Sequence, residues 1–287
     1  MKTIKQRRSI AFGVVLMTLV AGACLSAASA QEPVCLRYAP AQGQQWNEKL
    51  TGEVVDVAVQ GQSLGVTGLA TADIVAEISA LDAAKKTASL KLTSSNIAAC
   101  LNGQNSRPAA PQPMVLQVDQ TGKMTMNGAQ AEGAVNFMET GGVPLQIINI
   151  LVHNIRFSAD PVKKDDEWTA EDSYAFPGMA TVPLNTRWKL MGQEGDKVTI
   201  CSTAVATMPD FKAPNPMVPG TEMDVKGATV TITEMKQEYD TKLSRVLKTQ
   251  GTLSIQAKVD MQGMQLPLVL ALKFKLDPAA AAKEPPR

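Results

Sequence analysis

Alternation of apolar and polar residues with a period of two dominates this sequence. Successive side chains of a strand point to opposite faces, so each such run predicts a strand with one buried face. The clearest run places six apolar residues on one face: Leu266, Leu268, Leu270, Leu272, Phe274 and Leu276. Shorter runs of the same kind occupy residues 55–60, 74–78, 88–93, 198–200, 230–232 and 253–259. Short turns such as Gly61-Gln62 join several runs, which predicts antiparallel neighbours.

The middle of the chain changes to helical spacing. Residues 131–138 and 144–157 carry apolar side chains three and four positions apart, and Pro144 suits the first turn of a helix. We therefore predict one or two amphipathic helices. An apolar helix face must be buried, and the concave side of a curved sheet is the natural place for it.

Together these patterns predict an all-β or β-dominated α+β protein. The expected fold is a curved, partly closed antiparallel β-sheet in two similar halves, with the central amphipathic helices inside it. A weak internal repeat supports the two halves, because Pro40 before Trp46 and Pro161 before Trp168 give both a similar start. The expected segments are a signal peptide (1–30), an N-terminal β half (31–126), a central helical segment (127–157), a C-terminal β half (158–276) and a disordered tail (277–287). Within the two β halves, residues 102–113, with three prolines, are expected to be irregular, and residues 208–227, with four, are expected to form a long loop.

The first thirty residues predict export. A basic start, an apolar run over residues 10–24 and the motif Ala28-Ser29-Ala30 are typical of a secretory signal peptide, cleaved between Ala30 and Gln31. The apolar run is shorter than the roughly 20 residues that a membrane-spanning helix needs. We therefore expect a periplasmic or extracellular protein.

Two variants of the export signal stay open. The residues before Cys24 resemble a lipobox, so lipidation of Cys24 would make the protein a peripherally anchored lipoprotein. The pair Arg7-Arg8 before the apolar run would be compatible with export in the folded state.

Charge excludes one class of partner. The chain has 28 basic and 27 acidic residues, and four of the basic ones fall in residues 1–30, so the remainder has a net charge of −3. Nucleic-acid binding needs a basic surface, so we expect no such partner.

Three cysteines follow the predicted signal peptide, and an odd number leaves at least one thiol free. Cys35 and Cys100 lie in the same half and are the expected disulfide, since export permits one. The alternative is three free thiols that pack as small apolar side chains. None of the cysteines has the spacing of a metal site, so we expect no metal and no cofactor.

Two motifs contain residues that could take part in catalysis or metal binding, but a structural role is favoured for both. Ser63 lies in a G-x-S-x-G sequence, but that motif needs a strand–turn–helix context, and His153 would be the only available base. We interpret residues 61–65 as a turn and His153 as a structural histidine. Asp165, Asp166 and Glu167 predict a solvated acidic turn, with weak calcium binding as the alternative.

The sequence carries a family resemblance in its turns. Leu36-Arg37-Tyr38 before Gly43-x-x-Trp46, and the stretch from Asp160-Pro161 to Trp168, resemble an uncharacterised family of bacterial exported proteins and lipoproteins. Lys164 stands where that family has glycine. The expected architecture is also similar to that of lipoprotein carriers of the LolA type, although a shared fold does not imply a shared function.

These observations predict a non-catalytic, monomeric cell-envelope protein that binds a lipid or another apolar small molecule between sheet and helix. The expected lining residues are Val57, Ile74, Leu90, Leu151, Ile155, Leu268, Leu270 and Leu272. The first alternative is a structural or interaction protein of the envelope, with a filled interior and no ligand. An exported serine hydrolase using Ser63 is the second and less favoured alternative.

Overall fold

The computed structural model describes residues 32–126, 143–175, 181–214, 222–261 and 264–279. The predicted signal peptide, Cys24, the cleavage site between Ala30 and Gln31 and the helical pattern at 131–138 lie outside these residues. Within the described ranges, one helix, α1 (Leu145–His153), accompanies fourteen strands. The strands are β1 (Gln45–Val59), β2 (Gln62–Ser63), β3 (Gly68–Asp82), β4 (Thr87–Leu101), β5 (Gln104–Ser106), β6 (Met114–Asp119), β7 (Met124–Met126), β8 (Glu167–Ala175), β9 (Thr181–Glu194), β10 (Lys197–Thr207), β11 (Phe211–Pro214), β12 (Glu222–Asp240), β13 (Arg245–Met261) and β14 (Met264–Pro278).

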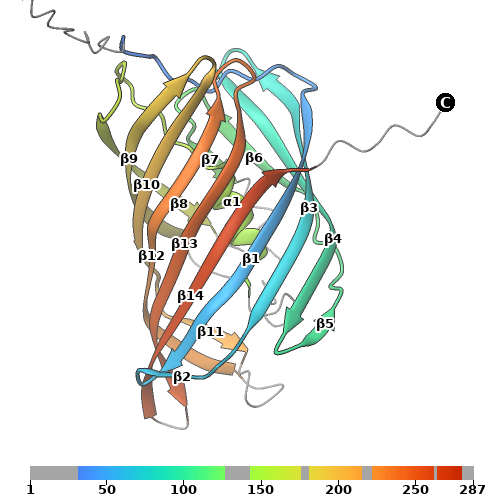
Figure 1. The fold of residues 1–287 in the computed structure, drawn as a ribbon, viewed down its shortest axis with the longest axis vertical. Helices are drawn as coiled ribbons and strands as arrows, with labels where there is room; N and C mark the ends of the chain where they lie inside the picture. Colours follow the sequence, from blue (N-terminus) through green and yellow to red (C-terminus); the bar gives the residue numbers. More distant parts are fainter. Residues whose placement is uncertain (1–31, 127–142, 176–180, 215–221, 262–263, 280–287) are drawn as a thin grey trace, which may run out of the picture. The chain divides into compact units, whose positions relative to one another are not determined.

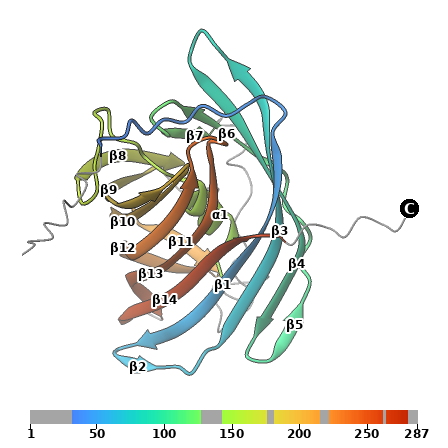
Figure 2. The same cartoon turned by 45° about the horizontal axis from the view of Figure 1, so that its top comes forward.

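All fourteen strands belong to one antiparallel sheet, in the order β7-β6-β4-β3-β1-β14-β13-β12-β10-β9-β8, with β2, β5 and β11 paired at its margins. The sheet curves strongly and nearly closes around α1, as Figures 1 and 2 show. The strands before α1 form one side and those after it form the other, and the two sides join where β1 pairs with β14. The predicted curved antiparallel sheet is therefore confirmed.

The inward face follows the period-two pattern. Leu50 on β1 and Leu276 on β14 are cross-strand partners and are fully buried. Lys273 and Lys275 on β14 alternate with buried Leu272 and Phe274 and point outward. Register shifts in β1, β3, β10, β12 and β13 add local bends, which help such long strands to curve.

Of the one or two helices predicted for the central segment, the described residues contain one, α1. It has nine residues and ends at His153, before the predicted limit at residue 157, because Asn154 takes an extended conformation. Residues after it run along the sheet, where the Phe157 ring packs 5.0 Å from that of Tyr239. A side chain at Gly122 would overlap the Ile155 carbonyl, so this glycine lets the two backbones approach.

Three further differences concern strands. Residues 208–227, expected as a long loop, contain β11 and the start of β12, because cross-strand hydrogen bonds organise a segment whose four prolines suggest irregularity. Strand β5 lies within the segment expected to be irregular after residue 101. Strand β14 extends to Pro278, past the expected start of the tail.

No helix among the described residues is long and apolar enough to cross a membrane.

Candidate functional site

The candidate site is the interior of the sheet around and beyond α1. Seven of the nine residues of α1 are buried, because the helix lies inside the curved sheet and packs against its inner face. Its first turn has no side-chain cap, and its carboxyl end is fixed by polar side chains from three strands.

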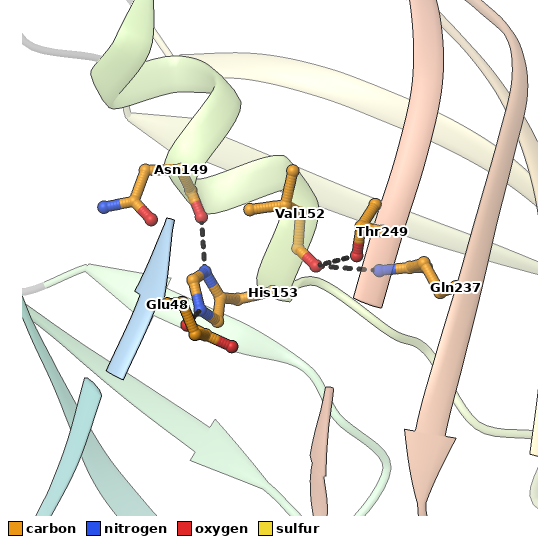
Figure 3. Close-up of polar contacts among 6 residues, drawn as sticks. All are labelled: Glu48, Asn149, Val152, His153, Gln237 and Thr249. Atoms are coloured by element: carbon orange, nitrogen blue, oxygen red, sulfur yellow. Dashed lines mark hydrogen bonds and ion pairs between the residues drawn. The ribbon is translucent and has the colours of Figure 1, made fainter. Parts of the chain in front are cut away.

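The first of these contacts is a buried pair between His153 and Glu48 of β1. His153 Nε2 lies 2.8 Å from Glu48 Oε2, and each side chain is only 2% exposed. His153 Nδ1 lies 2.7 Å from the backbone carbonyl of Asn149 (Figure 3). Both neighbours are hydrogen-bond acceptors. A proton therefore lies on Nδ1, and a second one lies between Nε2 and the Glu48 carboxyl group.

Electrostatics agree with this proton count. Burial is the largest influence and lowers the pKa of His153, because it disfavours the charged ring. The Glu48 carboxylate and the hydrogen bonds to Glu48 and the Asn149 carbonyl act in the opposite direction and prevail, so the pKa of His153 lies above its ordinary value. The predicted structural histidine is thus half of a buried ion pair.

Strands β12 and β13 hold the same end of the helix. The Val152 carbonyl accepts hydrogen bonds from Gln237 Nε2 and Thr249 Oγ1, each at 3.0 Å (Figure 3). Gln237 Nε2 also donates to the Asn154 carbonyl at 3.2 Å. The last carbonyls of a helix have no partner within the helix, and here they are buried, so these two side chains supply the missing donors.

Two glycines on the inner face of the sheet, Gly52 and Gly251, form a shallow notch, and the helical segment packs against it at Gly52. Gly52 on β1 and Gly251 on β13 flank Phe274 of β14, and all three face inward. A side chain at Gly52 would collide with Val143 and approach Ile148. Gly52 therefore lets the helical segment lie directly on the sheet, whereas Gly251 leaves room for the Phe274 ring.

Near the buried pair the interior is almost filled. A cavity of about 20 Å³ is lined by His153, Tyr38, Trp46, Tyr239, Arg245 and neighbouring apolar side chains, among them Leu90 and Ile155. That volume is enough for about one water molecule. The region around α1 is therefore packed.

Beyond α1, the inward side chains of the sheet change from buried to partly exposed between two adjacent rows. The row Ile232–Leu253–Leu272–Val54 crosses β12, β13, β14 and β1, and its members are no more than 5% exposed. The next row, Val230–Ile255–Leu270–Val57, crosses the same strands and is half-buried. Leu268 and Leu266 continue this half-buried surface along β14, whereas their partners on β13, Ala257 and Val259, are buried.

The predicted lining residues therefore divide into two groups. Val57, Leu268 and Leu270 lie together on the half-buried surface. The others are part of the packed core: Ile74, Leu90, Leu151, Ile155 and Leu272. All eight belong to the same apolar interior, but only the first group has exposed area.

The remaining candidate residues lie elsewhere. Ser63 Oγ is exposed and donates to Asp56 Oδ1 at 2.6 Å, whereas both ring nitrogens of His153 face Asn149 and Glu48. The structure therefore does not bring Ser63 to its expected base.

The acidic residues form an ordered turn. Asp165 pairs with Lys189 at 3.0 Å, and Asp166 Oδ2 accepts the backbone N–H of Lys163. No group of three or more His, Cys, Asp or Glu side chains in the described ranges is arranged to hold a metal ion.

The expected Cys35–Cys100 disulfide is not formed in the structure. Both cysteines are free, as is Cys201. Cys35 adjoins the bridge between Val34 and Val162, whereas Cys100 lies near the end of β4 beside β5. Membership of the same half of the sequence did not place the two thiols together, because β4 carries Cys100 to the other end of the sheet (Figure 1).

Sequence reasoning missed Glu48, Gln237 and Thr249. The sequence did contain a signal for Glu48. In the alternating pattern of β1 it lies at an inward position, between the inward residues Trp46 and Leu50. A charged residue at a core position predicts a buried partner. Nothing local identified that partner, which lies 105 residues away.

Comparison with known proteins gives little sequence information. No protein-family model matches the chain, and no curated protein matches it. One solved structure that is similar in part is of lipovitellin, described by its lipid–protein interactions, with a TM-score of 0.45 and 9% sequence identity. The match covers 86% of this chain, which spans 26% of the lipovitellin chain.

Proposed function

We propose that this is an exported, non-catalytic protein of the cell envelope that binds a lipid or another apolar small molecule on the inner face of the sheet beyond α1. The observation that supports this most directly is the change between two adjacent rows of inward side chains. The row ending at Val54 is closed, and the row ending at Val57 is half-buried.

An acyl chain is a suitable ligand for this surface. The surface is apolar, concave and continuous across four strands, and its side chains are large. Each buried CH₂ group of a ligand contributes about 0.8 kcal/mol, so a ten-carbon chain gains roughly 8 kcal/mol before the entropy of association is subtracted. Export is proposed from residues 1–30, whose pattern is that of a signal peptide.

The test is uptake of a fluorescent fatty acid, at a concentration below micelle formation, by the purified protein. The variant Leu270→Gln places an amide on the inner surface, and Val269→Gln places the same amide on the outer face of the same strand. We expect wild type and Val269→Gln to bind and Leu270→Gln to bind about 5- to 150-fold more weakly, since an unpaired amide costs about 1–3 kcal/mol. Equal affinity of the two variants, or no uptake by wild type, would refute the proposal.

A structural or interaction protein of the envelope is the second candidate. The packed interior around α1, with a cavity of only about 20 Å³, favours it. This candidate predicts no ligand in the extract of the purified protein and no uptake in the same assay.

A further inference from the structure

Three segments that lie at one end of the sheet contain no charged residue. Residues 57–72, 92–106 and 264–272 contain no Asp, Glu, Lys, Arg or His. About eight charged residues would be expected in these 40 positions, because 19% of the whole chain is charged. Surfaces and strand ends of soluble proteins normally carry charges, lysine above all, which oppose association.

These three segments meet in space. The turn after β1, the junction of β4 and β5 and the start of β14 lie at the same end of the sheet (Figure 1). Gln60 N–H donates to the Pro267 carbonyl at 2.9 Å, and Asn102 N–H donates to the Thr67 carbonyl at 2.8 Å. The uncharged segments thus form one continuous margin from β4 and β5 to β14. It is bordered by three charged residues, Asp56 on β1, which pairs with Ala271, and Lys258 and Asp260 on β13, which pair with Pro267 and Gln265.

Large apolar side chains are exposed along this margin. Met264 is 61% exposed, Leu64 55%, Val55 48% and Leu69 45%. We call these four residues, together with residues 266–271 of β14, the apolar rim. Isolated exposed apolar residues need no explanation, but a group of them in an uncharged margin indicates an interaction surface.

Strand β14 indicates what kind of surface covers the rim. Leu266, Leu268 and Leu270 face inward, and Val269 and Ala271 face outward, yet all five are half-buried. A protein partner docks on one face of a strand. A lipid layer surrounds an inserted strand end on both faces, so an apolar residue at every position suits lipid.

Charge complementarity supports the same occupant. On the outer face next to the rim, Glu53, Glu234, Lys236, Lys273 and Lys275 line a groove of about 400 Å³ across β1, β14, β13 and β12. Side chains of both signs directly beside an uncharged apolar edge match the order of a bilayer surface, where phosphate and ammonium groups overlie the hydrocarbon.

We propose that the apolar rim inserts into the surface of a phospholipid bilayer, with this charged groove at the level of the headgroups. The proposal rests on the proposed function, because the half-buried inner surface begins at the rim and would receive a lipid directly from the bilayer.

The experiment is flotation of the purified protein with vesicles of phosphatidylethanolamine and phosphatidylglycerol at a ratio of about 3:1. The test variant is Leu64→Glu with Met264→Glu. The matched control is Leu81→Glu with Leu243→Glu, which are 42% and 41% exposed at the opposite end of the sheet. We expect wild type and control to float and the test variant to bind at least about tenfold more weakly, because two apolar anchors are lost. Raising the salt from 0.1 to 1 M should change wild-type binding by less than about twofold, since apolar insertion is not screened.

Failure of wild type to float, equal loss in both variants, or loss of binding in high salt would overturn the rim proposal. Uptake of the monomeric fluorescent fatty acid without vesicles distinguishes this from failure of the proposed function. Uptake without flotation leaves an apolar binder that has no membrane contact, whereas flotation without uptake leaves a membrane-surface protein with no internal ligand.

Discussion

The buried pair between Glu48 and His153 should make stability depend on pH in a way that a single substitution reverses. The pair joins β1 to the end of α1, and neither side chain reaches solvent. Breaking a buried ion pair by removing one partner typically costs about 3–5 kcal/mol, because the remaining group must either stay charged without a partner or give up its charge. We therefore expect Glu48→Gln to lower the free energy of unfolding by about that amount at pH 6.

The pH dependence follows from the direction of the pKa shift. The pKa of His153 is higher in the folded protein than its ordinary value of 6.5. Its contribution to stability is thus fully present below pH 6.5 and is lost as the pH rises through the raised pKa. Within that window one proton gives a slope of at most about 1.4 kcal/mol per pH unit. Without the Glu48 carboxylate, burial dominates and the pKa of His153 should fall below its ordinary value. Glu48→Gln should therefore gain stability as the pH rises towards 6.5, and His153 should contribute no pH dependence above that value.

The assay is urea unfolding of wild type and Glu48→Gln at several pH values between 5 and 9, with tryptophan fluorescence as the measure of unfolding. Lys91→Gln is a suitable control, because its pair with Glu77 is exposed and should contribute at most about 1 kcal/mol. The difference in stability between wild type and Glu48→Gln should be largest at low pH and shrink as the pH rises. Parallel curves over the whole range would show that His153 does not titrate against Glu48, and the assigned proton would be wrong.

Three further expectations test the packing, the helix anchor and the cysteines. Gly52→Ala should lower stability by about 1–3 kcal/mol because its methyl group collides with the helical segment, whereas Gly192→Ala, with open space around it, should not, and equal melting temperatures would contradict the notch. Thr249→Val should cost about 1–2 kcal/mol in urea unfolding by leaving a buried helix carbonyl with one fewer donor, and an unchanged midpoint would refute that role. Exposed Cys35 should react with maleimide in the native protein faster than half-buried Cys201, whose pKa is raised by burial, and mass spectrometry showing no modification of Cys35 would contradict its free state.

Much of the fold was predictable because its signal is local. Residues 266–276 show strict alternation, and the side-chain direction of a strand depends only on its own backbone. The residues after Pro144 were identified as a helix for the same reason. Its end at His153 was not predictable, because the apolar spacing continues through Ile155 while the chain turns to follow the sheet. The proline-containing stretch at 208–227 was expected to be a loop, and pairing with β12 made part of it a strand.

The candidate site was predictable only in part. Val57, Leu268 and Leu270 were chosen by their alternation and do lie on the half-buried inner surface. Leu272 has the same signal one row earlier and is fully buried. The difference between them is the position of α1 inside the sheet, which no single strand encodes. The apolar rim has a sequence signal, the lack of charge in residues 57–72 and 264–272, but its meaning depends on the two segments meeting in space.

By itself, then, the sequence determined the longer strands with their buried faces and the helix after Pro144, because hydrophobic periodicity records which side of each element avoids water. The tertiary structure alone decided the strand order, the place of α1 and the pairing of Glu48 with His153. These depend on contacts between residues far apart in the chain, such as the 105 positions that separate this pair. Such contacts are selected by the shape and polarity of the whole interior, where a buried charge is stable only beside its partner.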